Sequence, residues 1–193
     1  KFLDISFAFS SLLYGLMFAK RPDVIYAYHP PLTVSISAVI IKLFRQVPVV
    51  LDIQDMWPDT LKATGMISNP RLLGFVSKVC NLIYSAVTKI IVLSPGFENL
   101  LINRGVPDSK IEIIYNWADE EVLRTTTNKT PKELSNIEGF KILFAGNVGQ
   151  AQGLNVILNA ALLLKDDVPE LHFLVLGRGL QLDDLKRRAN DLN

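Results

Sequence analysis

The sequence has few of the residues from which metal sites and disulfides are built, since it holds one cysteine and two histidines. Cys80 lies in the apolar run FVSKVCNLIYSAV, so we expect a buried free thiol in a reducing compartment. With only His29 and His172 beside it, no zinc cluster is expected. The sequence therefore argues against a disulfide and against a zinc site built from cysteine and histidine.

An excess of charge of one sign is also missing. Twenty lysines and arginines face nineteen aspartates and glutamates, and the net charge of +1 gives no sequence-wide field to attract nucleic acid. The hydrophobic content of 49% is that of a globular protein with one large domain or two small ones. Because the chain opens on Lys1 and stops inside a helical pattern, we expect a fragment of a longer protein.

The first segment, FLDISFAFSSLLYGLMFA, is mostly apolar and has nearly the length of a membrane-spanning helix. Asp4, three serines and Gly15 argue against a span, and only Lys1 would serve as the basic region of a signal peptide. The pattern favours a buried or partly interfacial helix. A helix lying on a membrane surface and a membrane span are the alternatives.

Strand and helix patterns alternate up to residue 115. The short β-rich runs DVIYAY and VPVVLDI enclose LTVSISAVIIKLF, which is long enough for a helix that covers a sheet. Ser94 and Pro95 indicate the start of a later helix, and Arg104 with Gly105 indicates its end. The other expected elements are a helix at 71–87 and strands at 89–94 and 110–115.

Residues 123–140 interrupt this rhythm with threonine, asparagine, lysine and proline, so we interpret them as a linker. Strands are expected after it at 141–146 and 170–177, each followed by a helix with one apolar face. Buried strands joined by crossover helices predict an α/β protein with two Rossmann-like parallel-sheet domains, both incomplete, at residues 1–122 and 141–193. Ligands of such sheets bind outside the carboxyl ends of the strands.

At one of these ends, LFAGNVGQAQGL leads a strand through three glycines into a helix. We expect Gly146 and Gly149 to take positive φ or to approach a ligand closely, and Gly153 to lie where the helix begins. Backbone amides at a helix N-terminus attract anions even without a cationic side chain. The spacing fits neither a dinucleotide fingerprint nor a P-loop, and a tight turn without a ligand is the alternative.

A second glycine pair, Gly177 and Gly179, follows the next strand and has Arg178 between its members. Two glycine-rich loops on neighbouring strands favour a shared ligand over two separate turns. The alternative for Arg178 is a solvated loop cation.

In the first half, LDIQDMWPD places Asp52, Asp55 and Asp59 around a buried strand end. Asp55 comes just past the strand and is the candidate to orient a sugar hydroxyl or to act as a base. Helix capping or a salt bridge is the alternative for Asp55, and more so for Asp59. His29 either lines the same cleft or is an ordinary hydrogen-bonded histidine.

Taken together, these motifs resemble the bacterial glycosyltransferases of family four, which have the two-domain GT-B fold. KILFAGNVGQAQGLNVILNAALLL and LHFLVLGRGLQLDDLKRRANDL are similar to the first two β-α units of the family's donor-sugar domain. VPVVLDIQDMWPD and KIIVLSPGFENLLINRGVPDSKIEIIYNWAD resemble the closing part of its acceptor domain. The pairing of DMWPD with GNVGQAQGL resembles the subgroup that builds surface polysaccharides from amino or deoxy sugars, including fucosamine-type transferases.

The resemblance implies which residues form the site. Asp55 takes the catalytic position, with His29 and Gln54 on the acceptor side, although many members have histidine in place of Gln54. Many members hold the donor diphosphate with an arginine and a lysine, where this chain has Asn147 or Val148, and Gln152. The diphosphate charge must then be met by amides, by Arg178 or by groups beyond Asn193. The implied donor site comprises Gly146, Asn147, Val148, Gly149, Gln150, Gln152, Gly153, Gly177, Arg178 and Gly179, with no metal and no separate cofactor.

For the parent protein, the resemblance implies transfer of a sugar from a nucleotide-diphosphate donor to a lipid-linked saccharide acceptor, with retention at the anomeric carbon. The setting would be capsule, O-antigen or exopolysaccharide synthesis, in the cytoplasm or peripherally on the inner face of the cytoplasmic membrane. The fragment itself is expected to be inactive, because the family's N-terminal glycine loop and E-x7-E motif would lie outside it. A nucleotide-sugar 2-epimerase of the same fold and a non-catalytic nucleotide-sugar-binding or scaffold module are the alternatives.

Overall fold

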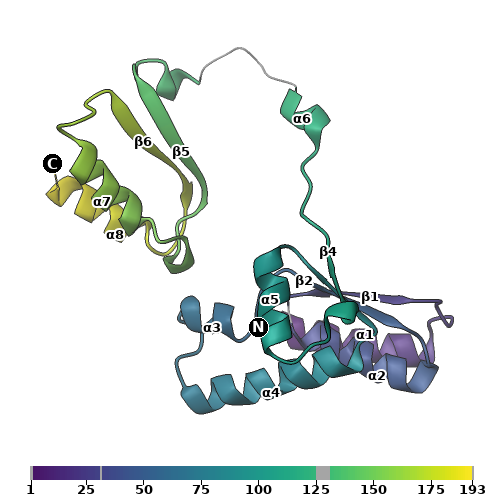
Figure 1. The fold of residues 1–193 in the computed structure, drawn as a ribbon. Coiled ribbons are helices and arrows are strands. Elements are labelled where there is room, and N and C mark those ends of the chain that lie inside the picture. Colours follow the sequence, from purple (N-terminus) through teal and green to yellow (C-terminus); the bar gives the residue numbers. More distant parts are fainter. Residues whose placement is uncertain (1, 31, 125–130, 193) are drawn as a thin grey trace. The chain divides into compact units, whose positions relative to one another are not determined.

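The computed structural model describes residues 2–30, 32–124 and 131–192. It divides into two compact units, Lys1–Ala118 and Asp119–Asn193, each with a parallel sheet (Figure 1). This confirms the predicted α/β class. The assignment of residues 123–140 to an interdomain linker stays a prediction, and residues 125–130 of that stretch lie outside the described residues.

The first unit holds a four-stranded sheet in the order β1-β2-β3-β4. Its strands are β1 (Ile25–His29), β2 (Val49–Ile53), β3 (Lys89–Val92) and β4 (Ile111–Ile113). Its helices are α1 (Phe2–Met17), α2 (Leu32–Arg45), α3 (Asp59–Ala63), α4 (Pro70–Ala86) and α5 (Pro95–Asn103), with a 3-10 helix at Asp108–Lys110. The short helix α3 has no counterpart among the sequence predictions.

The strands β3 and β4 are both shorter than predicted, because the chain leaves the sheet soon after Val92 and after Ile113. Ser94 leaves the sheet to cap α5, and its Oγ accepts a hydrogen bond from the Phe97 N–H at 3.3 Å. Pro95 occupies the first turn, and Gly105 follows the helix with a φ of +87°. Since β4 pairs with β3 only up to Ile113, the chain leaves the sheet there.

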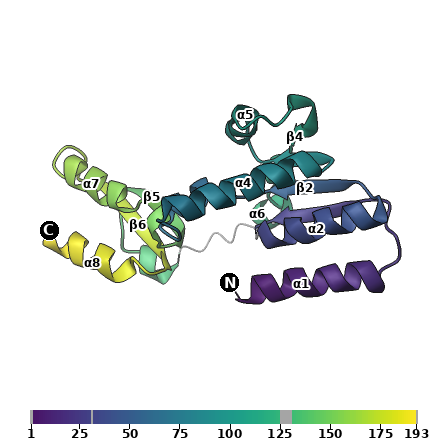
Figure 2. The same ribbon diagram turned by 90° about the horizontal axis from the view of Figure 1, so that it is seen from below.

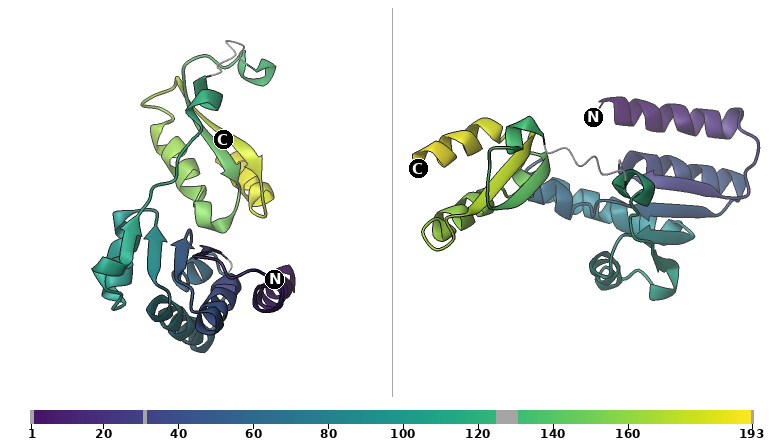
Figure 3. Two further views of the ribbon diagram at one scale, coloured as in Figure 1. Left: turned by 90° about the vertical axis from the view of Figure 1, so that its right-hand side faces the viewer. Right: turned by 90° about the horizontal axis from the view of Figure 1, so that it is seen from above.

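One layer of helices covers one face of this sheet. The helices α1, α2 and α4 lie side by side, with α1 at the end of the row beyond β1 (Figure 2). A view along the strands shows the same layer below the sheet (Figure 3). The other face carries Tyr26 and Tyr28, both more than half exposed. Along the described part of the chain, no helix has the length and apolarity to cross a membrane.

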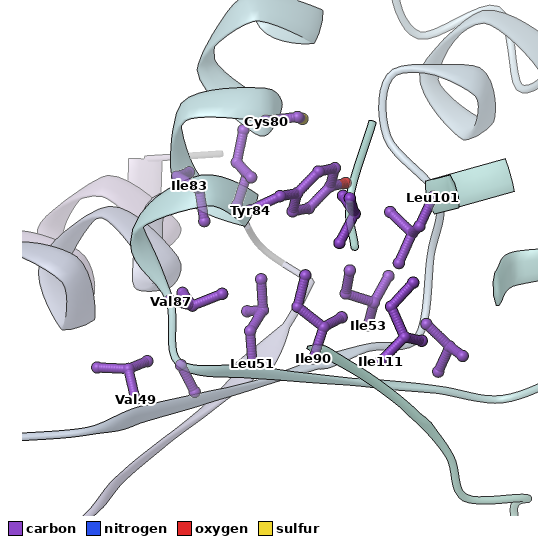
Figure 4. Close-up of a cluster of buried hydrophobic side chains, with 14 of the residues drawn as sticks. Val49, Leu51, Ile53, Cys80, Ile83, Tyr84, Val87, Ile90, Leu101 and Ile111 are labelled. Atoms are coloured by element: carbon purple, nitrogen blue, oxygen red, sulfur yellow. The ribbon is translucent and has the colours of Figure 1, made fainter. Parts of the chain in front are cut away.

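The core of the first unit lies between this sheet and α4. The side chains of β2 and β3 that face α4 are wholly buried, and they meet three buried residues of that helix (Figure 4). The strand residues are Val49, Leu51, Ile53, Ile90 and Val92, and the helix residues are Cys80, Ile83 and Tyr84. Cys80 is free and buried, as the sequence predicts.

The second unit is a two-stranded parallel sheet with its connecting helices. Its elements are α6 (Glu120–Arg124), a 3-10 helix at Lys132–Leu134, β5 (Phe140–Asn147), a 3-10 helix at Gln150–Gln152, α7 (Asn155–Leu164), β6 (Leu171–Arg178) and α8 (Leu182–Asp191). Val148, Leu154 and Leu185 form its small buried core. This core holds the ends of both strands in place.

Replacing Leu51 with alanine is expected to destabilise the first unit by about 2–5 kcal/mol, because the side chain is wholly buried and leaves a cavity. Leu43→Ala is the matched control, because it removes the same atoms from a side chain that is exposed on α2. Urea unfolding followed by circular dichroism measures both. Equal losses in the two variants would contradict the assignment of the core.

Candidate functional site

The carboxyl ends of β1 and β2 lie next to each other in the first unit. The strands are in parallel register, with His29 opposite Ile53. The backbone N–H of Gln54 then donates to the His29 carbonyl at 2.8 Å, which extends the pairing past both strands. The predicted acceptor-side residues His29 and Gln54 therefore lie next to each other along the backbone, at the carboxyl ends of their strands.

His29 is wholly buried, and neither ring nitrogen has a hydrogen-bond partner among the described residues. Its ring stands edge-on to Trp57, with centroids 5.5 Å apart and planes at 79°. Burial lowers the pKa of His29 to about 4, and its own backbone and the nearby charge of Asp55 only partly oppose this shift. The imidazole is neutral at pH 7, and no other residue that the structure describes donates a hydrogen bond to it or accepts one from it.

Asp55 lies in the bend after β2 and is partly exposed. Its carboxylate makes no hydrogen bond or ion pair to any residue that the structure describes, so neither capping nor a salt bridge explains it. Asp59 differs, because it opens α3 and forms an ion pair with Arg104. Of the two carboxylates, Asp55 is the one left to meet a ligand, and its catalytic role stays a prediction.

Gln54 is turned toward Asp52 rather than toward His29. Its Nε2 donates to Asp52 Oδ1 at 2.7 Å, and the Tyr26 hydroxyl donates to Asp52 Oδ2. This hydrogen bond is the main cause that raises the pKa of Tyr26 to about 12. Since side chains alternate along β2, Asp52 and the buried Ile53 beside His29 point to opposite faces. The two acceptor-side candidates thus extend on different sides of the sheet.

Sequence reasoning missed the bond from Tyr26 to Asp52. Asp52 is only 6% exposed, and its two donors satisfy one carboxylate oxygen each. A signal for the pair exists in the strands IYAYH and VVLDI, where Tyr26 and Tyr28 of one strand and Asp52 of the other fall on the same face.

In the second unit, the two glycine loops follow strands that are paired to their ends. Gly146 lies opposite Gly177, and Asn147 lies opposite Arg178. Beyond them the Val148 N–H donates to the Arg178 carbonyl at 2.8 Å. The structure therefore brings the predicted donor-site loops together, while the binding role of their residues stays a prediction.

The loop glycines differ from the expectation in their backbone angles. Gly153 has a positive φ, of 60°, just before α7, while Gly149 is extended and Gly146 is an ordinary strand residue. A Cβ on Gly177 would collide with the Gly146 carbonyl, and one on Gly179 would collide with the Val148 backbone. The second glycine pair is thus required for the close approach of the two loops, whatever they bind.

Val148 is a correction to the predicted donor site. Its side chain is wholly buried in the small core. Its N–H bonds Arg178, and its carbonyl accepts from the Gln181 N–H at 3.1 Å. No polar group of Val148 is left for a ligand, because the residue anchors the loop instead.

The groups that remain available at these loops suit an anion. Within the described residues, the backbone N–H groups of Gly149, Gln150 and Ala151 donate no hydrogen bond. The same two loops carry the exposed side chains of Asn147, Gln150, Gln152 and Arg178. Amide donors with one guanidinium can bind a diphosphate by hydrogen bonds and charge.

Other places in the described chain do not compete with these loops. No three His, Cys, Asp or Glu residues in it gather as metal ligands, and the absence of a metal cofactor stays a prediction. A cavity of about 390 Å³ in the second unit is lined mainly by apolar residues of α7, β6 and α8. It contains none of the predicted site residues.

Comparison with known proteins identifies relatives over most of the chain. A family model described as a glycosyl transferase 4-like domain matches residues 3–117. WbjE of Pseudomonas aeruginosa, named as a glycosyltransferase, is 25% identical over 177 residues, which are 89% of this chain and 43% of WbjE. WcaI of Escherichia coli, named as a colanic acid biosynthesis glycosyl transferase, is 26% identical over 185 residues, 90% of this chain and 44% of WcaI. The chain spans about half the length of these curated relatives.

The fold has solved counterparts. The crystal structure of HepE from Anabaena in complex with UDP matches with a TM-score of 0.66 and 15% sequence identity, over 98% of this chain and 48% of HepE. HepE has also been crystallised with UDP-glucose. At this identity the likeness shows the fold, and it confirms the predicted GT-B architecture.

His29 is expected to make the first unit less stable in acid. Between about pH 6.5 and about pH 4 the unfolded chain binds a proton at this histidine and the folded chain does not, so stability falls as pH falls, by roughly 3 kcal/mol over the window. Urea unfolding at about pH 7 and about pH 4.5 measures this loss, which His29→Phe should reduce. The same acid loss in both proteins would contradict the neutral buried state.

Proposed function

Since the matched family model covers residues 3–117, more than half of the chain, the chain belongs to the glycosyl transferase 4-like family, and we propose that it forms part of a glycosyltransferase of bacterial surface-polysaccharide synthesis. The names of WbjE and WcaI support this activity. The observation that carries the proposal is the pair of adjacent loops after β5 and β6, with free amides and Arg178.

The donor is a nucleoside diphosphate sugar. Negative charge grows on the diphosphate as its bond to the sugar breaks, and fixed hydrogen-bond donors at that point lower the barrier. The N–H groups of Gly149 and Gln150 and the Arg178 guanidinium supply such donors. The complexes of HepE with UDP and UDP-glucose support a uridine nucleotide as the first donor to test.

The acceptor hydroxyl binds at Asp55. The free, partly exposed Asp55 carboxylate accepts its hydrogen bond, while the buried His29 packs behind Trp57 and does not touch the substrate. A neutral His29 adds no positive charge that would draw the carboxylate away from the acceptor. We expect retention at the anomeric carbon and transfer of an amino or deoxy sugar.

The acceptor is lipid-linked, and α1 is the element that would bring the protein to the membrane surface. Its outward residues include Phe7, Phe9 and Tyr14, all well exposed, and the cations Lys20 and Arg21 follow the helix. Exposed aromatic side chains beside basic residues bind the interface of anionic lipids. This supports peripheral membrane association on the cytoplasmic side.

Calorimetric titration of the chain with UDP, GDP and their sugars tests the donor site. Arg178→Ala is expected to weaken binding about tenfold, the effect of losing one hydrogen bond from a charged group. Gly149→Val should weaken binding, because its Cβ would meet Asn147 Nδ2 at 2.9 Å and Gln152 Oε1 at 3.0 Å and displace both side-chain amides.

Arg187→Ala is the matched control for this titration, since Arg187 is an exposed arginine of the same unit that pairs with Asp184 on its own helix. Its affinity should equal that of the unaltered chain. If Gly149→Val binds as the unaltered chain does, the loop is a structural turn and the donor-site proposal fails. If nothing binds at all, the activity proposal loses its main support.

Cosedimentation with anionic phospholipid vesicles tests the membrane proposal. Phe9→Ser is expected to weaken vesicle binding about tenfold or more, given the free energy of burying one phenylalanine side chain. Phe44→Ser makes the same change on the neighbouring helix α2, where the side chain is also exposed. Equal effects of the two changes would contradict a specific role of α1.

A further inference from the structure

Arg104 links the end of α5 to the segment that carries the acceptor-side residues. It follows the last residue of α5, and its side chain is only 15% exposed. One guanidinium nitrogen, Nη1, donates to the Trp57 carbonyl at 2.9 Å. The other, Nη2, forms the ion pair with Asp59. A single side chain thus bridges two points of the DMWPD segment, residues 55–59, that lie far from it in the sequence.

The guanidinium rests on the rigid core of the first unit. Its positive charge partly opposes the rise that burial causes in the pKa of Tyr84, which places it beside the buried end of α4. Leu101, one turn earlier in α5, is wholly buried in the same core. Arg104 is therefore anchored to the packed core. The residues that it holds lie just after the end of β2, where no strand of the described chain pairs with the backbone.

The DMWPD segment, which Arg104 holds, covers one side of the His29 ring. The Trp57 ring packs against the imidazole, and the charge of Asp55 reaches it. Between them Met56 is buried in the core. A shift of the Trp57 backbone would move the ring off His29 and change the position of Asp55 at the same time.

We propose that Arg104 is a positioning residue, which fixes the DMWPD segment through its bond to the Trp57 carbonyl and so sets the places of Asp55 and the ring over His29. The proposal that this segment meets the acceptor gives the bridge its functional meaning, while the bridge itself is a property of the fold. Arginine suits this place because its planar fork reaches two acceptors at once, which a lysine ammonium does not match.

The ion pair to Asp59 is the lesser of the two contacts. Asp59 is 58% exposed, and ion pairs at exposed carboxylates contribute little because water screens them. The hydrogen bond to the Trp57 carbonyl comes from the same charged group at a part-buried position. Loss of Arg104 and loss of Asp59 should therefore have unequal effects.

NMR titration of the histidine signals in the labelled chain tests the proposal without any substrate. In the unaltered chain the His29 midpoint is expected at about 4. In Arg104→Gln the loosened segment admits water to the imidazole, so the midpoint should rise toward the ~6.5 of a solvated histidine. His172, in the second unit, supplies an internal reference signal.

Arg45→Gln is the matched control, because Arg45 also donates to backbone carbonyls, those of Leu16 and Ala19, but between α1 and α2. It should leave the His29 midpoint unchanged, as should Asp59→Asn. An unchanged midpoint in Arg104→Gln would overturn the proposal, and so would a shift of equal size in Asp59→Asn.

Arg104→Lys keeps the test decisive if the glutamine variant does not fold. A lysine can keep the pair with Asp59 but not the fork, so its His29 midpoint should also rise, by a smaller amount. A midpoint equal to that of the unaltered chain would overturn the proposal. Because none of these readouts needs a donor or an acceptor, a failure of the transferase proposal leaves their outcome interpretable.

Discussion

Parallel strand pairing is the constraint on which both candidate half-sites depend. It puts the carboxyl ends of neighbouring strands at one edge of a sheet, so that loops distant in sequence meet there. In the first unit this brings His29 to the bend that contains Asp55. In the second unit it sets Asn147 opposite Arg178. In each unit the candidate site residues lie on short loops. The register of the two strands that lead into these loops determines which of the residues become neighbours.

The sequence predicts this framework well because the patterns are local. Apolar runs bounded by caps and glycines place the strands and most helices within a few residues, as Ser94, Pro95 and Gly105 do for α5. The short helix α3 has no such pattern, since it follows directly from the DMWPD segment. The ion pair at its first residue, Asp59, comes from Arg104, which lies 45 residues further along the chain.

The chemistry of the site is less predictable, because it depends on burial and on contacts between distant strands. Nothing local distinguishes a buried His29 without ring hydrogen bonds from an exposed one. Likewise, the family resemblance implies a donor site that includes Val148 and Gly179, whereas the fold uses both for contact between the two loops. Gln54 was expected on the acceptor side with His29, but its amide donates to Asp52, whose side chain lies on the opposite face of the sheet and also accepts from Tyr26.

The strand β1 also has a consequence for handling the molecule. It pairs on one side with β2 and forms an edge of the sheet in the described chain, and its sequence IYAYH has no lysine, proline or acidic residue. Natural sheets use such residues to prevent edge-to-edge association. With Tyr26 and Tyr28 exposed on the adjoining face, two copies can add strand to strand. We therefore expect the chain on its own to self-associate as its concentration rises, and a charged side chain introduced on β1 would be the direct means to suppress it.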